Sequence, residues 1–512
     1  MAKRIIIVGG GTAGWLTAAY LIRSLGRSGW SITLVESPDI GIIGVGEGTF
    51  PTIRETLSAI GVDEREFLRE ADGSFKQGVR FSGWTGGPTP GNDTDDYFHP
   101  FNLPYGGDEG LLPYWIKAAG EARRPSYADA VTVQGHVIRA GCAPKRASDP
   151  GFDGPMNYAY HFDAARFADY LRKVATANGV ERIEATINEV RQAEDGRIAA
   201  VVPGDGREAI EGDFFIDCSG FRALLIGKAL GSPFRHVGDV LFNDRALAMQ
   251  VPHGDADTPI RPYTLATAHE AGWTWDIGLG ARRGIGYVYS SRHSDDEAAE
   301  RVLRAYVGKA ADGLSPRQLR FESGYRSVQW IGNCAAVGLS AGFFEPLEST
   351  GIMLIEVAAR MISDFLGSPA IDEAAMAAAA RQYNRLMLAR FDAIVEFLKL
   401  HYCISGRRDT AYWRDNSDAA SIPEGLRDKL AQWRHRPPSR FDFVVDHETF
   451  LPASWQFILY GMGFRTDPAA VSSSHRDDEQ AGAAFVRVFQ AARQAVAELP
   501  PHRALLEQLR AA

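Results

Sequence analysis

Two short apolar runs near the start of the chain have the pattern of buried β-strands. The runs IIIV (5–8) and ITLV (32–35) are rich in β-branched residues, and between them a glycine turn leads into TAGWLTAAYLIRSL. Continuous apolar runs of this length are typical of strands buried on both faces, while the longer segment between them has the composition of a helix. The pattern predicts a βαβ unit over residues 5–36.

Further along the chain the pattern changes twice. Residues 179–221 alternate between strand-like runs and turns, and they close on the apolar run FFI (214–216), which carries DCSG at its carboxyl end. After about residue 365 the chain contains long Ala- and Leu-rich segments, such as 372–400 and 483–499, that predict helices. We expect an α/β fold with strand-rich insertions over residues 1–365 and a mainly helical C-terminal lobe over residues 366–512.

Composition narrows the classes of function. The chain has 512 residues, of which 45% are hydrophobic and 23% charged, and its formal net charge is -9. A nucleic-acid partner is not expected, because phosphate binding needs clustered Lys and Arg. The four cysteines include no C-x-x-C pair, so neither a zinc site nor a disulfide framework is predicted, and no apolar run is long enough for a membrane span. We expect no metal, no membrane partner and a cytoplasmic location.

The glycine turn after the first strand has the spacing of a dinucleotide-binding motif. Gly9, Gly11 and Gly14 occupy the G-x-G-x-x-G positions. Glycines there permit a tight turn, a close approach of the backbone to a pyrophosphate and close packing of helix on strand, and the helix N-terminus favours the negative charge. Glu36 ends the second strand, where an acid accepts hydrogen bonds from ribose hydroxyls. A purely structural turn is the alternative, but the complete βαβ context favours a dinucleotide site.

The rest of the chain favours FAD over NAD. The DCSG segment resembles the second half of the FAD domain in two-lobed flavoproteins of the glutathione-reductase type, and Leu339 stands where a later turn of such proteins carries Asp and touches the flavin chain. The segment GIIGVGEGTFP (41–51) is expected to form a strap along the flavin, with an ordinary loop as the alternative. No second glycine motif follows a later strand, so no nicotinamide lobe is predicted. The expected cofactor-binding residues are Gly9, Gly11, Thr12, Ala13, Gly14, Glu36, Gly46, Glu47, Asp217, Gly220 and Leu339.

Several further segments carry a family resemblance. They are GGGTAGW (9–15), GVGEGTFP (44–51), FKQGVRFSGW (75–84), YFHPF (97–101), GWTWDIGL (272–279), FFEPLESTGI (343–352) and LHYCISGRRDTAYWRD (400–415). Together they resemble the flavin-dependent halogenases of the tryptophan type, from residue 5 to about residue 465. Trp273 and Trp275 are expected on one face of a strand, either as core or against the flavin. One departure is Gly278, where the family has a proline.

The resemblance implies a chemistry for the turn FFEPLESTGI. In the family, reduced FAD and oxygen convert chloride or bromide into hypohalous acid. Ser349, Thr350 and Gly351 are implied to hold the halide, as the start of a helix is suited to do.

The resemblance also implies two catalytic residues. Lys76 matches the essential lysine of the family, which either hydrogen-bonds the hypohalous acid or carries the halogen as a haloamine. Glu348 matches the glutamate that orients the lysine or removes the proton from the halogenated ring. From residue type alone, a surface lysine and a helix-start glutamate are the alternatives.

The implied substrate is an electron-rich arene. His99 and Phe101 match a pair that flanks an indole ring, and Trp455 stands where the opposing aromatic wall is expected. Tryptophan halogenases also use a Tyr-Tyr pair and a Glu upstream of that tryptophan to hold the amino and carboxylate groups, but the segment RFDFVVDHETF (440–450) lacks the tyrosines. Free tryptophan, indole, a substituted indole and an indole within a larger molecule therefore stay open.

The expected partners are a separate flavin reductase that supplies FADH2 and a small aromatic substrate, and a homodimer stays open. Two other functions share parts of the pattern. One is a one-component FAD aromatic hydroxylase that uses NAD(P)H, and the other is a flavoprotein without catalysis on an arene. The combination of Lys76, Trp273 and Glu348 favours the halogenase.

Overall fold

The chain folds into two compact units, each assembled from three segments. The structure, a computed structural model, describes residues 3–41, 46–87, 89, 94–107, 110–118, 124–255, 257–443, 449–471 and 478–511. The first unit contains residues 1–73, 162–237 and 322–391, and the second contains residues 74–161, 238–321 and 392–512. These units do not coincide with the expected division at residue 365, because strands from the middle of the chain form a sheet of their own in the second unit.

A mainly parallel sheet forms the centre of the first unit. In order across the sheet, its strands are β20 (Trp330–Ile331), β21 (Cys334–Ala336), β12 (Phe214–Asp217), β1 (Lys3–Val8), β2 (Trp30–Glu36) and β8 (Glu181–Glu184). The apolar run of β1 is buried, as its pattern predicted. Val8 of β1 lies opposite both Val35 and Asp217, so the carboxyl ends of β1, β2 and β12 share one edge. Ligands of open α/β sheets bind at this edge.

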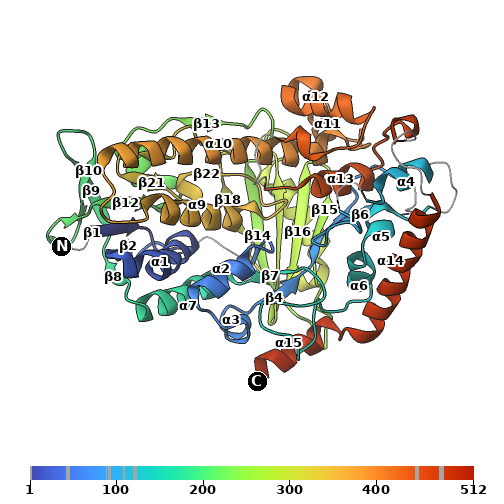
Figure 1. The fold of residues 1–512 in the computed structure, drawn as a ribbon, viewed down its shortest axis with the longest axis horizontal. Helices are drawn as coiled ribbons and strands as arrows, with labels where there is room; N and C mark the ends of the chain where they lie inside the picture. The colour runs from blue at the N-terminus through green and yellow to red at the C-terminus, as the bar shows by residue number, and fades with distance from the viewer. Residues whose placement is uncertain are drawn as a thin grey trace. The chain divides into compact units, whose positions relative to one another are not determined.

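Helices cover this sheet. Helix α1 begins at the glycine turn, as predicted, and it contacts β2, α7 and α9 (Figure 1). The helices of the first unit are α1 (Thr12–Leu25), α2 (Ile53–Ile60), α3 (Glu64–Glu70), α7 (Ala164–Ala177) and α9 (Thr350–Leu366). Its short strands are β3 (Glu47–Gly48), β9 (Ile187–Gln192), β10 (Ile198–Pro203), β11 (Ile210–Glu211), β13 (Phe234–His236), β19 (Gly324–Arg326) and β22 (Gly342–Phe343).

The helix predicted over residues 372–400 is observed as α10 (Glu373–Cys403). The boundary between the two units falls within this helix, after Phe391.

A seven-stranded sheet forms the second unit's core. In order, its strands are β18 (Arg317–Arg320), β14 (Arg245–Pro252), β17 (Arg282–Tyr289), β16 (Gly272–Gly278), β15 (Thr264–Ala268), β5 (Gly78–Ser82) and β6 (Asp96–Pro100). Every residue of β16, the GWTWDIG strand, is buried. The Trp275 ring lies over Gly286, where an added Cβ would come within 2.1 Å of the ring, and the Trp273 and Trp275 ring centroids are 6.3 Å apart. Both tryptophans therefore contribute to the core of this unit.

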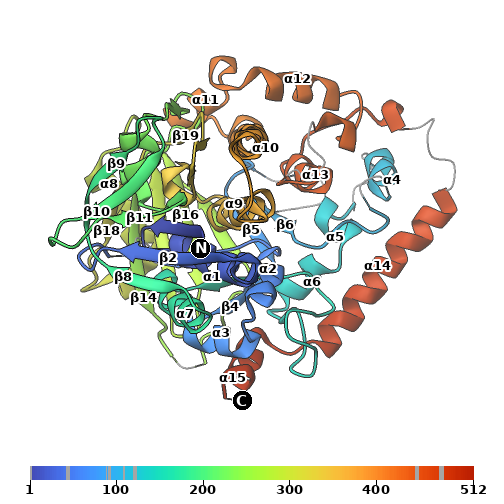
Figure 2. The ribbon, with the colours of Figure 1, turned by 60° about the vertical axis from the view of Figure 1, so that its left-hand side comes forward.

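Outside this sheet, β4 (Ser74–Lys76) pairs with β7 (Ala159–Phe162). Helix α13 packs on β6, and α14 lies beside α5 and α6 (Figure 2). The helices of the second unit are α4 (Leu112–Lys117), α5 (Tyr127–Val131), α6 (Gln134–Arg139), α8 (Asp296–Val307), α11 (Ala411–Asn416), α12 (Glu424–Trp433), α13 (Pro452–Gly461), α14 (Asp478–Glu498) and α15 (His502–Ala511).

Candidate active site

The glycine turn of the first unit leaves room for a phosphate group. A Cβ added to Gly9, whose φ is +118°, would lie 2.1 Å from the Cys218 carbonyl oxygen, and one added to Gly14 would lie 1.8 Å from the Gly9 carbonyl oxygen. By contrast, a Cβ on Gly11 would meet no atom within 4 Å. The turn is therefore closed toward the protein at two glycines and open at the third, at the N-terminus of α1. This arrangement fits the pyrophosphate of FAD.

Glu36 has protein partners at the end of β2. Its carboxylate accepts a hydrogen bond from Trp15 Nε1 at 3.1 Å and one from Arg182 Nε at 2.6 Å. The early tryptophan of the motif GGGTAGW thus has a structural task, since it holds the acid expected at the ribose.

Asp217 organises the DCSG turn. Its buried carboxylate accepts hydrogen bonds from the backbone amides of Ser219, Leu225 and Ile226 and from the Ser219 hydroxyl. Burial raises the pKa of this carboxyl, and these hydrogen bonds oppose the rise. Asp217 shapes the turn at the strand edge, and Gly220, at φ +69°, stays open, with no atom within 4 Å of an added Cβ.

The turn containing Leu339 lies against the glycine turn. A Cβ on the neighbouring Gly338 would lie 2.7 Å from the Ala13 Cβ, and the Ser340 hydroxyl donates to the Asp217 carbonyl oxygen. The structure therefore brings together three of the sequence segments predicted to bind the cofactor, namely 9–14, 217–220 and 338–340.

The predicted strap is described in part, because residues 42–45 lie outside the described residues. Residues 46–51, called the strap segment below, contain Gly46 at φ 147° and the half-buried Glu47 of β3. Desolvation raises the pKa of Glu47 to about 7. A carboxyl of this kind is about half protonated near neutral pH and so carries less charge than an ordinary glutamate, which suits a segment expected beside an anionic dinucleotide.

The turn predicted to hold the halide is strained. Ser349 immediately precedes α9 and adopts left-handed backbone angles, φ 58° and ψ 38°, which are uncommon for a residue other than glycine. Thr350 begins the helix, and the exposed Gly351 has open space where a Cβ would be. Glu348, directly before this turn, is buried. The start of this 17-residue helix, with strained backbone at the buried Ser349 and an exposed Gly351, fits an anion site.

In the second unit, Lys76 is wholly buried on β4. Its Nζ lies 5.3 Å from the centroid of the Phe101 ring. In the pairing with β7, Lys76 lies opposite Ala159 and Ser74 lies opposite His161, so Lys76 and His161 are diagonal neighbours on one face. The surface lysine that residue type alone allowed is thereby excluded.

Two buried histidines near Lys76, His161 and His502, stay neutral near pH 7, and neither was predicted from the sequence. Desolvation lowers the pKa of His161 well below its usual range, with the charge of Lys76 as a further cause. His161 Nε2 lies 2.8 Å from the Thr264 hydroxyl. His502 Nε2 accepts from the Phe75 amide and Nδ1 donates to the Ile260 carbonyl oxygen, and desolvation lowers the pKa of His502 to about 4. No sequence motif marks either histidine, because the pairing of β4 with β7 and the docking of α15 bring them to this place.

An aromatic wall connects the predicted substrate residues. The His99 ring lies 6.0 Å from Phe397, and Phe397 contacts Trp455 edge-on at 4.9 Å. Phe450 stacks on Phe397 at 3.7 Å. His99 and Trp455 were predicted from the sequence. Phe397 and Phe450 were not, because they lie in a helical run and a loop without a recognisable motif. We refer to His99, Phe397, Phe450 and Trp455 as the aromatic wall.

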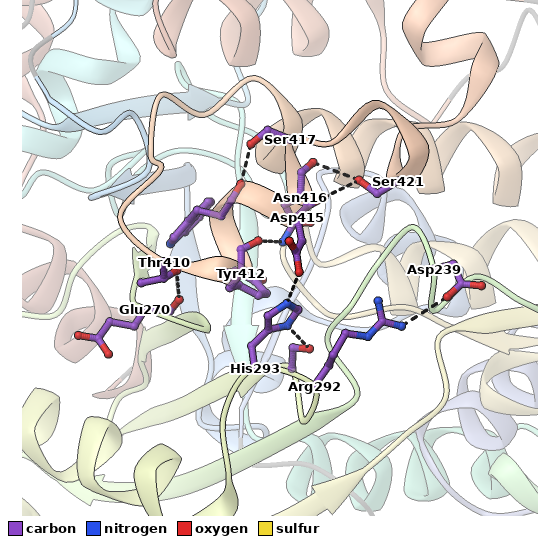
Figure 3. A network of polar contacts seen from close by, with 12 residues as sticks. Asp239, Glu270, Arg292, His293, Thr410, Tyr412, Asp415, Asn416, Ser417 and Ser421 are labelled. Atoms are coloured by element: carbon purple, nitrogen blue, oxygen red, sulfur yellow. Dashed lines mark hydrogen bonds and ion pairs between the residues drawn. The ribbon is translucent and has the colours of Figure 1, made fainter.

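The motif segment 400–415 is anchored by a polar network in the same unit (Figure 3). His293 lies 2.9 Å from the Ser290 hydroxyl through Nδ1 and 2.9 Å from the Asp415 carboxylate through Nε2. The buried Lys399 donates to the side-chain oxygen of Asn416 at 3.0 Å. These contacts hold the segment and its flanking residues in place within the unit.

Two other properties bear on function. Across the described ranges, no helix combines the length and apolarity needed to cross a bilayer. Within the same part of the chain, no group of three or more His, Cys, Asp or Glu side chains is placed to hold a metal ion.

Comparisons with known proteins agree with this geometry. The sequence model of the family described as tryptophan halogenase matches residues 4–478. The chain is 36% identical to the 7-chloro-L-tryptophan 6-halogenase KtzR of Kutzneria sp. (strain 744), covering 99% of both chains. A solved tryptophan halogenase from Shewanella frigidimarina superposes with a TM-score of 0.93 at 40% identity, covering 99% of this chain and 98% of that one. BrvH, a flavin-dependent halogenase from Brevundimonas sp. BAL3, superposes with a TM-score of 0.84 at 34% identity over 99% of both chains.

Proposed function

Because this chain belongs to the tryptophan halogenase family, we propose that it halogenates an indole-type arene, with Lys76 and Glu348 as its catalytic residues. The chain is a flavin-dependent halogenase with the FAD-binding fold, and it uses FADH2, oxygen and chloride or bromide. When bound, reduced FAD with oxygen supplies the oxidation that turns halide into hypohalous acid. Overall, FADH2, oxygen, halide, arene and a proton give FAD, the halogenated arene and two molecules of water.

The observation that carries the assignment of Lys76 is its burial beside an aromatic ring. An ammonium group without exposure, 5.3 Å from the Phe101 ring centroid, is shielded from water, and an N–H donor there acts more strongly than it would in water. Its Nζ–H would donate to the oxygen of hypohalous acid, so that this oxygen leaves as water when the arene carbon bonds to the halogen. General acid help of this kind is worth roughly two to four orders of magnitude in rate. In the alternative route, Nζ first takes the halogen and then passes it to the arene.

Glu348 is assigned to the second half of the reaction, the removal of a proton from the halogenated ring. After the carbon–halogen bond forms, the ring carbon must lose its proton to recover aromaticity. The buried Glu348 carboxylate precedes the strained turn at Ser349 and is assigned to accept that proton. Ser349, Thr350 and Gly351 are assigned to the halide, since the backbone amides of a helix start favour an anion.

The substrate assignment rests on the aromatic wall. KtzR is named for a chlorinated tryptophan, and indole rings stack well against aromatic side chains. For this chain we assign an electron-rich indole, with His99, Phe101 and Trp455 around the ring. A separate flavin reductase is the proposed source of FADH2.

Mass spectrometry tests the proposal. The purified chain would receive FAD, a flavin reductase, NADH, oxygen and bromide or chloride, with indole and tryptophan offered separately. The wild type should yield products with the bromine or chlorine isotope pattern, and Lys76→Met should lose them while FAD binding persists. Lys117→Met, at a partly exposed lysine, is the matched control and should keep the activity. Hydroxylated product, or NADH consumption coupled to product without the reductase, would contradict the proposal in favour of an aromatic hydroxylase.

A further inference from the structure

Helix α9 buries a single acidic side chain in an otherwise apolar stretch. Its sequence TGIMLIEVAARMI places Glu356 six residues after Thr350, and the side chain is 1% exposed. Six residues correspond to about 9 Å along a helix axis. A buried carboxyl in such surroundings is costly unless it is hydrogen-bonded. Its partners therefore indicate its task.

Those partners belong to the first turn of α2. The Thr56 hydroxyl donates to Glu356 Oε2 at 2.5 Å, and the Thr52 hydroxyl donates to Oε1 at 3.3 Å. Thr52 occupies the N-cap position of α2 but makes no side-chain capping bond to that helix. A threonine at this position ordinarily caps its own helix. Here its hydroxyl is directed to α9 instead, so the contact between the helices replaces a local cap.

Arg360, one turn further along α9, completes the contact. It donates to the Thr56 hydroxyl at 3.0 Å and reaches the Glu55 carboxylate at 3.2 Å. Two consecutive turns of α9 thus hold the first turn of α2. Burial raises the pKa of Glu356 to about 8, while the threonine hydroxyls and the charge of Arg360 oppose the rise.

The two helices lead to different parts of the cofactor and halide sites. Residue 51, the last of the strap segment, is followed directly by Thr52. The start of α9 is the segment assigned to the halide. A helix transmits a displacement along its axis because its hydrogen-bond ladder makes it stiff, so a shift at either segment reaches the contact between Glu356 and the two threonines.

We propose that Glu356 is a positioning residue that couples the halide segment of α9 to the strap segment through Thr52 and Thr56. The inference rests on the proposed function for the location of the halide. Halide at the start of α9 stabilises one placement of that helix, the contact with α2 passes this placement to the strap segment, and FAD is then held more tightly. By linkage, FAD raises the affinity for halide by the same factor.

A FAD titration with and without bromide tests the coupling. Bound FAD would be followed by its fluorescence for the full chain, which requires no halogenation. Bromide should tighten FAD binding to the wild type by about fivefold or more, a typical coupling. Glu356→Leu should abolish this bromide dependence. Glu356→Gln should keep it, because the amide oxygen still accepts hydrogen bonds from the threonines. Asp364 is exposed on the same helix, so Asp364→Leu is the control and should behave as wild type.

The outcomes separate the coupling from the proposed function. A wild type whose FAD affinity ignores bromide, or a folded Glu356→Leu that keeps the full bromide dependence, would overturn the coupling even if the enzyme halogenates indole. If Glu356→Leu does not fold, Thr56→Val removes the shorter hydrogen bond while leaving the carboxyl, and retention of the full bromide dependence in that variant would overturn the coupling. Loss of dependence in the folded variants supports it, even where no halogenated product forms and the proposed function fails.

Discussion

Phe450 stacks on Phe397, with ring centroids 3.7 Å apart and planes inclined by 22°. Both rings are buried, and Trp455, which contacts Phe397, donates its Nε1 hydrogen to the Phe450 carbonyl oxygen at 3.3 Å. The wall around the proposed arene is therefore apolar at this point. Asp442, a nearby acid in the sequence, is already bound by Arg436 and Trp433.

Uncharged indole should be preferred over free tryptophan. The ammonium and carboxylate of an amino acid lose their hydration on binding, and an apolar wall offers them no replacement. We expect kcat/KM for indole to exceed that for tryptophan by about tenfold or more, since unpaired polar groups are strongly rejected. Competition between the two substrates, followed by mass spectrometry, measures the ratio. A ratio in favour of tryptophan would show that charged partners reach the site.

The stack should also matter for stability. Phe450→Ala removes a buried ring, and such changes lower the free energy of unfolding by about 3–5 kcal/mol. Urea denaturation measures the change. Phe441, whose side chain is 81% exposed, provides the control, because Phe441→Ala should change stability by about 0.5 kcal/mol or less. Equal effects of the two variants would mean that Phe450 is not packed as described.

The neutral histidines should make the protein sensitive to acid. The unfolded chain protonates histidine near pH 6.5, whereas the folded pKa of His502 is about 4 and that of His161 is well below 6.5. Between pH 6.5 and 4 the unfolded state binds more protons, so stability falls as the pH falls. His161→Gln should reduce this slope by up to about 1.4 kcal/mol per pH unit. Urea denaturation at several pH values measures it, with the exposed His236→Gln as the control that should leave the slope unchanged.

Glu356 should produce the opposite slope. Its folded pKa of about 8 lies above the unfolded value of 4.5, so the folded state binds more protons between these pH values and stability falls as the pH rises. Glu356→Gln should remove up to about 1.4 kcal/mol per pH unit of this dependence. Arg360 and Glu55 face the same contact, and Glu47, with a pKa raised to about 7, leaves a smaller slope of the same sign in the variant. An unchanged slope would place Glu356 in contact with water.

Two glycine variants should separate folding from cofactor binding. In Gly14→Ala the new methyl would meet the Gly9 carbonyl oxygen at 1.8 Å, so we expect loss of both stability and FAD binding. In Gly11→Ala the methyl meets no protein atom within 4 Å, so thermal stability should persist while FAD affinity falls by about tenfold or more, because the methyl enters the space of the pyrophosphate. Thermal denaturation and FAD titration measure the two effects. Unchanged FAD affinity in Gly11→Ala would move the cofactor away from this turn.

Local patterns were enough for the βαβ unit, the long helix at residues 373–403 and the strand that carries Trp273 and Trp275. These elements follow from apolar periodicity and glycine spacing within a short stretch of the chain, and both can be read from the sequence alone. The motif FFEPLESTGI likewise predicted a helix start, which is observed at Thr350. Lys76 could be singled out by resemblance, but its burial could not be deduced from a single residue in a turn-like context.

Only the tertiary structure decided which distant residues became neighbours. His161 and His502 lie near Lys76 because a strand pairing and a C-terminal helix bring them there. Phe397 and Phe450 are in contact although 53 residues separate them in the sequence. Glu356 and Thr56 are 300 residues apart and share a hydrogen bond. The division into two units, each of three segments, has the same origin. Such contacts depend on the burial of whole faces and on the hydrogen bonds that burial demands, and no local pattern encodes them. The sequence determined the secondary-structure elements and the chemistry that each single residue can perform. Tertiary packing decided the surroundings of these residues, and the surroundings decide whether a titratable side chain is charged.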